Sequence, residues 1–354
     1  MRRLGVVLAA LVAASCGGSQ PTGRPADRTR IGLVFDTLRE ERWERDRDLF
    51  VDRARELGAE VVVRSADGDA GRQQALASEL LAGGIDVLVI VPTDLHRAGD
   101  IVREAAARGV PVVSYDRLIR DADVALYVSF DSVKVGRMQA EALLDARPTG
   151  RYVLLGGSPT DNNARLVRAG QMAVLQPAID AGRIRIVADY WVPGWDPVRA
   201  EETMRDVLRR TRNIQAVVAS NDSTASGAVA ALTAARLAGR VAVSGQDADL
   251  AACRRIVAGT QTMTVYKPLR PLARMAAGAA VNLARGENVD SLVTVHNGLK
   301  DVPARLLDPI AVDRTNLDVT VIADGYHSRD EVYQSARQEL PCPESPCPSS
   351  TPAR

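Results

Sequence analysis

Short apolar runs rich in valine and isoleucine alternate with longer charged or alanine-rich stretches over most of the chain. The short runs have the composition of buried β-strands, and the stretches between them have helical composition. Repeated strand–helix units predict parallel sheets with helices on both faces. The repetition pauses near Phe130–Lys134 and then restarts, so we predict an α/β protein with two Rossmann-like lobes. The predicted strands are Ile31–Phe35, Ala59–Arg64, Ile85–Val91, Val110–Val113, Ala125–Phe130, Tyr152–Leu155, Ile184–Val187, Ala216–Ala219, Val241–Ser244, Thr262–Tyr266 and the β-like run Leu317–Ile322.

One predicted helix, Leu269–Arg285, does not fit this count of strand–helix units. It follows the strand Thr262–Tyr266 and the dipeptide Lys267-Pro268. The helix either finishes the second lobe or belongs to a segment that crosses back to the first lobe. The pattern of apolar positions leaves both arrangements open.

The stretch Ala216–Asp249 shows most clearly where chemistry is placed on these lobes. It contains two predicted strands, and each ends abruptly in polar residues, Asn221-Asp222 after the first and Gln246-Asp247 after the second. In open α/β sheets, ligands bind outside the carboxyl ends of the strands. We therefore expect Asn221 and Asp247 to face a common ligand.

Similar polar residues lie near the ends of other predicted strands. Carboxylates, amides and cationic groups together supply the acceptors and donors that neighbouring hydroxyl groups need, and tryptophan supplies a flat apolar face for a sugar ring. A neutral polyol fits this mixture better than an anion does. The candidate ligand-binding residues are Arg42, Trp43, Asp116, Arg117, Asn163, Arg168, Trp195, Asn221, Asp247 and Lys267.

Most of these residues also have a purely structural interpretation. Aspartate and asparagine favour helix N-caps, which suits Asp116 and Asn221 equally well. An arginine in a charged helix usually lies on a solvated face, and a tryptophan is more often a packing residue than a ligand platform. Asp247 and Lys267 are harder to explain in this way, since Lys267 is one of three lysines in an arginine-rich chain.

Composition argues against several other classes of protein. The net charge of +1 provides no basic surface of the kind that binds nucleic acid. The chain lacks the glycine-rich nucleotide-binding motifs and the serine-hydrolase elbow. Its three histidines, His96, His296 and His327, match no metal-ligand spacing. We therefore expect no catalytic residues, no cofactor and no metal site.

The N-terminus has the pattern of an export signal. Arg2-Arg3 precede the apolar run Leu4–Ala14, which is too short to span a membrane, and small residues lead to Cys16. This pattern predicts a lipoprotein-type signal over residues 1–16 with the lipid on Cys16. Ordinary secretory cleavage nearby is the alternative. Residues 17–28 are rich in glycine, serine and proline and predict a flexible tether.

The other cysteines fall into two groups. Cys253 lies in a helical pattern, which predicts a packed free thiol. Cys342 and Cys347 lie in a proline- and serine-rich segment, residues 334–354, that we expect to be disordered. In an oxidising compartment these two cysteines are able to pair with each other.

Several longer strings resemble the D-xylose-binding proteins of bacterial ABC sugar importers. They are RIGLVFDTLREERWERDRDLF, SYDRLIRDADVALYVSFDSVKVG, GGSPTDNNARLVRAGQM, VVASNDSTASGA, VSGQDADL and AGTQTMTVYKP. They lie in collinear order from Arg30 to the mid-320s. The resemblance implies a type I periplasmic binding protein fold, with two lobes joined by three crossing segments. It also implies that the ten candidate residues above bind sugar and that the chain returns to the first lobe near Lys267-Pro268.

The expected lobes are residues 29–134 plus 268–298 and residues 135–267 plus 299–330. We expect an exported monomer in the periplasm or on the outer face of the cell membrane, which captures a monosaccharide, D-xylose in the first place, and delivers it to an ABC permease. Other pentoses and glucose remain open. A receptor for a chemotaxis or sensor-kinase partner and a sugar-acting hydrolase are the alternatives. A repressor with the same core is disfavoured, because a leader occupies the place of a DNA-binding helix-turn-helix.

Overall fold

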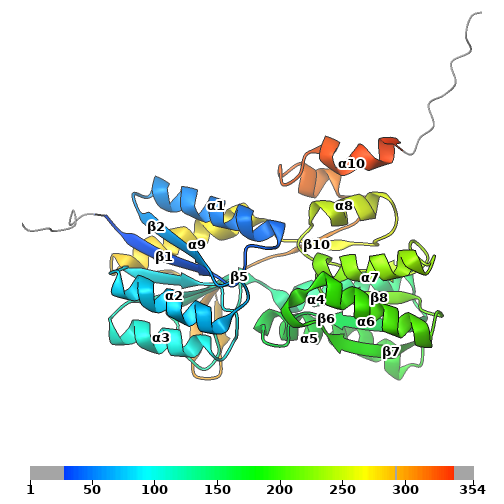
Figure 1. Cartoon of the computed structure of the whole chain (residues 1–354), viewed down its shortest axis with the longest axis horizontal. Helices are drawn as coiled ribbons and strands as arrows, with labels where there is room; N and C mark the ends of the chain where they lie inside the picture. The colour runs from blue at the N-terminus through cyan, green and yellow to red at the C-terminus, as the bar shows by residue number, and fades with distance from the viewer. Residues whose placement is uncertain (1–27, 292, 339–354) are drawn as a thin grey trace, which may run out of the picture.

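The structure is a computed structural model that describes residues 28–291 and 293–338. Two α/β lobes lie end to end along the long axis of the molecule (Figure 1). Cys16, Cys342 and Cys347 lie outside the described residues, as does all of the predicted tether except Arg28. Within the described residues, none of the helices combines the length and apolar character needed to cross a bilayer.

A seven-stranded sheet forms the first lobe, with the strand order β11-β12-β5-β4-β3-β1-β2. All neighbouring pairs are parallel except β11 with β12. The three central strands β3, β4 and β5 are buried along their whole length, which explains their unbroken apolar sequences. The strands are β1 (Arg30–Phe35), β2 (Glu60–Ser65), β3 (Val87–Ile90), β4 (Val112–Tyr115), β5 (Leu126–Phe130), β11 (Val293–His296) and β12 (Asp301–Leu307).

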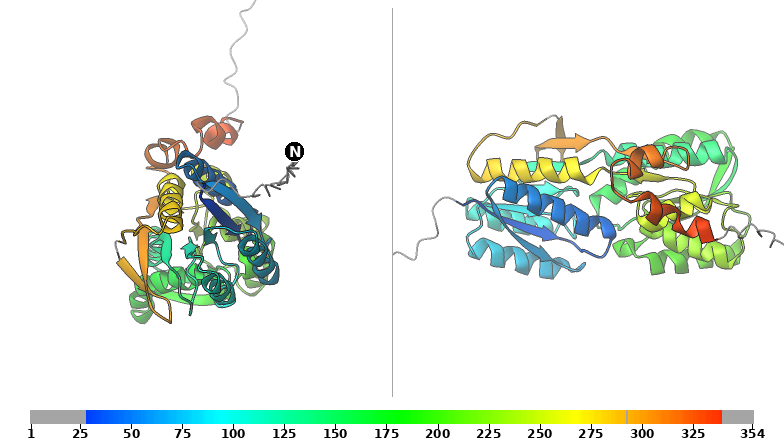
Figure 2. Two further views of the ribbon diagram at one scale, coloured as in Figure 1. Left: turned by 90° about the vertical axis from the view of Figure 1, so that its left-hand side faces the viewer. Right: turned by 90° about the horizontal axis from the view of Figure 1, so that it is seen from above.

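Helices cover both faces of this sheet. On one face α1 (Glu41–Glu56) and α9 (Leu269–Ala284) share an apolar core, and on the other lie α2 (Ala70–Ala82) and α3 (Ala98–Ala107). Figure 2 shows α9 alongside α1, although the two helices are far apart in the sequence. The helix that the pattern left unassigned therefore belongs to the first lobe.

The second lobe has a four-stranded parallel sheet with the order β7-β6-β8-β9. On one face lie α4 and α5, which approach so closely that a Cβ on Gly136 would meet the Val167 carbonyl oxygen at 1.9 Å. On the other face lie α6 and α7. The elements are α4 (Ser132–Ala146), β6 (Gly150–Gly156), α5 (Asn162–Asp180), β7 (Ile184–Trp191), α6 (Pro197–Arg210), β8 (Ala216–Ala219), α7 (Asp222–Ala234) and β9 (Ala242–Val243).

A third, smaller layer sits beside the second lobe. The strands β10 (Thr264–Tyr266) and β13 (Ile310–Val312) form an antiparallel pair. They pack with α8 (Leu250–Val257) and the C-terminal helix α10 (Arg329–Gln338) around a core of their own. The chain passes between the lobes three times, after β5, after β10 and after β12. This arrangement confirms the predicted fold class.

Three details of the prediction are wrong. Leu317–Ile322 was expected to be strand-like, but Asp318–Ile322 forms a π-helical turn, with the Ile322 N–H donating to the Leu317 carbonyl oxygen at 3.2 Å. Its β-branched residues suit a strand, but packing in the C-terminal core overrides that preference. The range 299–330 was expected in the second lobe, but β12 pairs in parallel with β5 of the first. The segment expected to be disordered from residue 334 is helical through Gln338.

The lobe boundary was misplaced because β11 and β12 were not among the predicted strands. β11 is largely exposed and β12 contains Pro303, so neither has the apolar character of the central strands. Their strand geometry comes from pairing at the edge of the first sheet. Cys253, by contrast, is confirmed as a buried free thiol.

Candidate functional site

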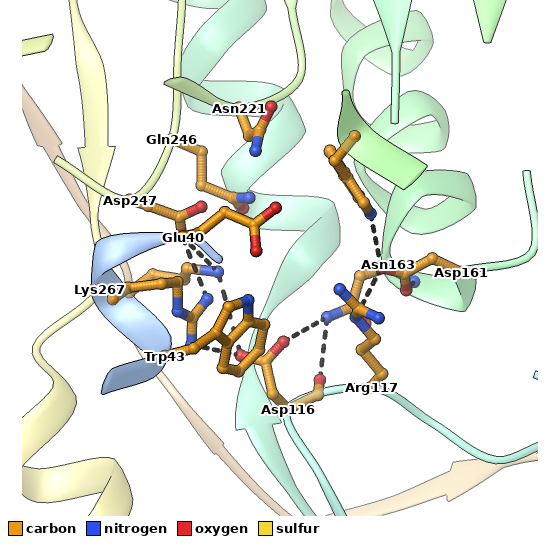
Figure 3. Close-up of a pocket in the computed structure, with 12 residues that line it drawn as sticks. Glu40, Trp43, Asp116, Arg117, Asp161, Asn163, Asn221, Gln246, Asp247 and Lys267 are labelled. Atoms are coloured by element: carbon orange, nitrogen blue, oxygen red, sulfur yellow. Dashed lines mark hydrogen bonds and ion pairs between the residues drawn. The ribbon is translucent and has the colours of Figure 1, made fainter. Parts of the chain in front are cut away.

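Polar side chains from both lobes meet in a pocket between them. The lining residues come from the start of α1, the loops after β4, β8 and β9, the start of α5, the turn Pro193–Trp195 after β7, and the crossing segment after β10 (Figure 3). Nine of the ten predicted residues line this pocket: Arg42, Trp43, Asp116, Arg117, Asn163, Trp195, Asn221, Asp247 and Lys267.

Arg42 joins the two walls of the pocket. Its guanidinium lies in the first turn of α1 and is almost fully buried, at 3% exposure. Nη2 donates to Asp116 of the first lobe at 2.8 Å, and Nη1 donates to Asp247 of the second lobe at 3.1 Å. The same guanidinium lies 4.1 Å from the centre of the Trp43 ring. A solvated helix face, the structural alternative for this arginine, is therefore wrong.

Asp116 is held as a carboxylate by the cations around it. Burial acts to raise its pKa, but Arg42, Lys267 and Arg117 outweigh that effect and lower the pKa to about 2. Its backbone is in the left-handed region, with φ at 58°, immediately after β4. Such a conformation is unfavourable for aspartate and is common at binding sites, where the surrounding structure enforces it.

A second ion-pair chain runs through Arg117. Its Nη1 donates to Asp36 at 2.6 Å and its Nε lies 2.8 Å from Asp161 Oδ2. That same oxygen accepts a hydrogen bond from the indole nitrogen of Trp195 at 3.1 Å. Asp161 thereby links an arginine of the first lobe to the tryptophan face of the second.

The second-lobe amides lie at helix N-termini. Asn163 is in the first turn of α5, and its amide nitrogen donates to the carbonyl oxygen of Asp116 at 2.9 Å. Asn221 is the N-cap of α7, where its Oδ1 accepts from the Thr224 backbone N–H at 2.9 Å. Figure 3 shows the Asn221 amide nitrogen directed toward the pocket. The capping and the ligand-binding interpretations of Asn221 are therefore compatible.

Asp247 and Lys267 complete the ionic centre. Lys267 Nζ lies 2.8 Å from Asp247 Oδ1 and 4.0 Å from Asp116 Oδ2. Asp247 has φ at 97° and Trp195 has φ at 57°, so three lining residues, with Asp116, are in the left-handed region. The lysine follows β10 and precedes Pro268, so it lies on a segment that connects the lobes. An ammonium at this point contacts carboxylates of both walls.

Arg168 is the one predicted residue that does not line the pocket. Its guanidinium pairs with Asp189, donates to Gln171 at 3.1 Å and packs over the Trp191 ring at 5.0 Å. Five residues separate it from Asn163 along α5, a rotation of roughly 140° around the helix axis. The helix therefore directs these two side chains to different sides.

Three lining residues were not predicted: Glu40, Asp161 and Gln246. Gln246 and Asp161 stand beside predicted residues in the polar strings after β9 and before α5, so proximity to a strand end was a usable signal. Glu40 directly precedes α1, and nothing in the sequence distinguishes it from the other carboxylates nearby.

Residues 31–288 match the model of the periplasmic binding protein domain. The chain is 52% identical over 308 residues to the D-xylose-binding periplasmic protein of Escherichia coli (strain K12), covering 87% of this chain and 93% of the relative. The chain belongs to the periplasmic binding protein family. A second member, the D-xylose-binding periplasmic protein of Haemophilus influenzae, is 50% identical, with coverage of 86% and 92%. The multiple sugar-binding periplasmic receptor ChvE of Rhizobium radiobacter is 30% identical over 87% of this chain and 93% of its own length.

Solved structures of this family share the same two-lobed fold. A carbohydrate transporter solute-binding protein from Chloroflexus aurantiacus, in complex with D-glucose, matches with a TM-score of 0.80 and 33% identity, over 86% of this chain and 98% of that one. An ABC transporter solute-binding protein from Clostridium phytofermentans, with bound β-D-glucose, matches with a TM-score of 0.79 and 29% identity, over 86% and 100%. Family membership and fold thus agree with the sequence resemblance.

Proposed function

We propose that this chain is the exported D-xylose receptor of an ABC sugar importer. The observation that carries this proposal is the ionic centre formed by Arg42, Asp116, Asp247 and Lys267, in which groups of both lobes face one pocket. The two relatives near 50% identity, both D-xylose-binding proteins, support the choice of sugar.

The pocket suits a neutral sugar because it offers fixed charges of both signs. Each sugar hydroxyl both donates and accepts, so it satisfies a carboxylate such as Asp116 and a cation such as Lys267 at the same time. Trp43 and Trp195 are the two aromatic side chains among the residues that line the pocket, and they provide apolar ring surface for the C–H faces of the sugar.

Capture by closure follows from the two-lobed geometry. A ligand that contacts both walls has more contacts when the lobes are close together, and it therefore favours the closed arrangement by its difference in affinity. The hinge would consist of the three crossing segments after β5, β10 and β12. A closed, loaded receptor then presents a surface that an ABC permease distinguishes from the open form.

Intrinsic tryptophan fluorescence and calorimetry with a panel of monosaccharides test this function. We expect D-xylose to bind most tightly, with other pentoses and D-glucose weaker, and the sugar to be recovered unchanged after prolonged incubation. Tighter binding of another monosaccharide would contradict the assignment of D-xylose. Conversion of the sugar would contradict a transport receptor and favour the hydrolase alternative.

We also propose that the receptor is a monomer held at the membrane by lipid on Cys16. The signal-like pattern before this cysteine supports the anchor. Labelling of the protein with a radioactive fatty acid in cells, and its loss in Cys16→Ser, tests the anchor. Light scattering of the protein without its signal tests the monomer.

A further inference from the structure

We propose that Glu40 is a further sugar-contacting residue, whose carboxylate accepts a hydrogen bond from one ring hydroxyl and thereby sets specificity. This inference rests on the proposed function and adds a contact that the ten predicted residues do not include. Glu40 lines the pocket together with Arg42, Asp247 and Asn221. Figure 3 shows its carboxylate pointing toward the centre of the pocket.

The local structure gives Glu40 no capping function that would account for this orientation. It occupies the N-cap position of α1, where serine, threonine, aspartate and asparagine are preferred. Its backbone carbonyl accepts from the Trp43 N–H at 3.0 Å, but its side chain makes no capping hydrogen bond with the described residues. The carboxylate is instead turned into the cleft.

The two carboxylate oxygens of Glu40 have different surroundings. Oε1 accepts from Arg39 Nη2 at 2.6 Å. Oε2 is buried and has no hydrogen-bond partner among the described residues, and the side chain as a whole is only 10% exposed. A buried, charged acceptor without a donor is costly, so a ligand group that donates to Oε2 gains the full strength of a charge-assisted hydrogen bond.

The charges of the lining select the kind of donor. Three cations, Arg42, Arg117 and Lys267, face the pocket with the carboxylates of Asp116, Asp161 and Asp247, and Glu40 adds a fourth carboxylate. An anionic substituent beside Oε2 would be repelled, whereas a hydroxyl donates without adding charge. The position therefore suits a hydroxyl of a neutral aldose.

Glu40 is also connected to the opposite lobe. The same Arg39 Nη2 that pairs with Oε1 donates to the carbonyl oxygen of Gly194 at 2.7 Å. Gly194 belongs to the short turn Pro193–Trp195 that carries the Trp195 face of the pocket. Arg39 thus holds the Glu40 carboxylate in place and connects it to the second lobe. We expect Arg39 itself to affect closure of the lobes and not the choice of sugar.

Calorimetry of Glu40→Gln with D-xylose and its monodeoxy analogues separates these effects. The analogues are 1,5-anhydroxylitol and the 2-, 3- and 4-deoxy sugars. We expect Glu40→Gln to weaken D-xylose binding about 10-fold, as a charge-assisted bond becomes a neutral one. For the one analogue that lacks the hydroxyl bound by Oε2, wild type and variant should bind equally.

Two matched variants are the controls. Glu44→Gln removes the same charge from the first turn of the same helix at an exposed position, and it should change D-xylose affinity less than about 2-fold. Arg39→Met removes both the contact with Gly194 and the ion pair with Glu40 Oε1, so it should weaken the binding of every sugar, including the analogue that lacks the hydroxyl bound by Oε2. Thermal melting of each variant checks that the fold is retained.

Two results would overturn the inference. One is an unchanged D-xylose affinity in Glu40→Gln; the other is an equal loss for every analogue, which would mean that Glu40 acts through closure without touching the sugar. Wild-type protein that binds none of these sugars would be a different result, since it would overturn the proposed function and this inference with it.

Discussion

The two walls of the pocket are built by different means. In the first lobe, Arg42, Asp116 and Arg117 are held by side-chain ion pairs, with Asp36 and Asp46 behind them. In the second lobe, Asn163 and Asn221 are positioned by backbone geometry at helix N-termini. The Asp161 carboxylate caps α5, accepting from the Asn163 N–H at 2.8 Å, and Asn221 caps α7.

The pKa values of two buried aspartates, Asp116 in the first lobe and Asp222 in the second, also differ. Asp116 on the first wall faces three cations, and its pKa falls to about 2. Asp222 lies directly beneath the second wall, and burial raises its pKa to about 7. The charge of Arg255 lowers this pKa only in part, and the charge of Asp247 raises it further. Its oxygens accept from Thr264 Oγ1 at 2.9 and 3.0 Å and from Gln261 at 2.8 Å. The lining carboxylate Asp116 is therefore stabilised in its charged form, whereas burial behind the walls favours the neutral acid, at Asp222 in the second lobe and at Asp46 in the first.

The largest effect is expected at Asp247, the point where the two walls meet. Asp247→Ala removes the second-lobe carboxylate that pairs with both Arg42 and Lys267, and it removes an acceptor for the sugar. A lost hydrogen bond to a charged group costs up to about 3 kcal/mol, so D-xylose affinity should fall about 100-fold in calorimetry. Asp189→Ala, outside the pocket, is the control. Near-normal affinity with a normal melting curve would contradict the assigned site.

Asn221 tests whether a second-wall residue has two functions. Asn221→Ala removes the helix cap, which should lower the free energy of unfolding by about 1 kcal/mol. It also removes the amide that faces the pocket, which should weaken D-xylose binding about 10-fold. Asn221→Ser restores a capping oxygen but not the amide donor, so stability should recover while affinity does not. Denaturant unfolding measures the stability of both variants, and calorimetry measures their affinity for D-xylose. Recovery of affinity in the serine variant would mean that Asn221 serves only the helix.

The pH dependence of stability distinguishes the buried support Asp222 from the lining residue Asp116. The pKa of Asp222 is raised from 3.8 to about 7 in the folded protein. The stabilisation from its neutral form is therefore complete below its unfolded pKa and is lost as the pH rises through about 7. The contribution of Asp116 to stability has the opposite pH dependence. Its lowered pKa stabilises the fold above pH 3.8, and this stabilisation disappears only as the pH falls through about 2.

We therefore expect the wild-type melting temperature to fall between about pH 4 and pH 7 and to level off above that range. Asp222→Asn keeps the shape of the side chain but cannot ionise, so it should flatten the upper part of this decline. The lower part of the decline should remain in this variant, because burial also raises the pKa of Asp46 in the first lobe, to about 6. Melting by circular dichroism across this range measures both. An equally steep decline in Asp222→Asn would exclude Asp222 as its source.

The smallest effect is expected at Arg168. Its partners Asp189, Gln171 and Trp191 lie outside the pocket, so Arg168→Gln should leave D-xylose affinity within about 2-fold of wild type. The same calorimetric titration checks this result. A large loss would return Arg168 to the site and would mean that α5 rotates when sugar binds.

The sequence by itself determined the alternation of strands and helices, the two lobes and nine of the pocket residues. Periodicity and polar strand ends are local signals, and the carboxyl ends of parallel strands converge on one edge wherever the sheet forms. Asn221 and Asp247 were placed correctly for that reason. The same logic does not determine where Arg168 points, because its direction depends on its angle around α5 and not on its distance from a strand end.

Only the tertiary structure decided the placement of the late segments and the pairing of the buried charges. α9 lies in the first lobe because its alanine-rich face packs against α1, and β12 becomes a strand because β5 offers an unpaired edge. The orientation of Glu40 is of the same kind. A carboxylate beside a helix start is equally consistent with solvent or with a cleft, and the choice depends on Arg39 reaching Gly194 across the lobes. Contacts between residues so distant in sequence leave no local pattern to read.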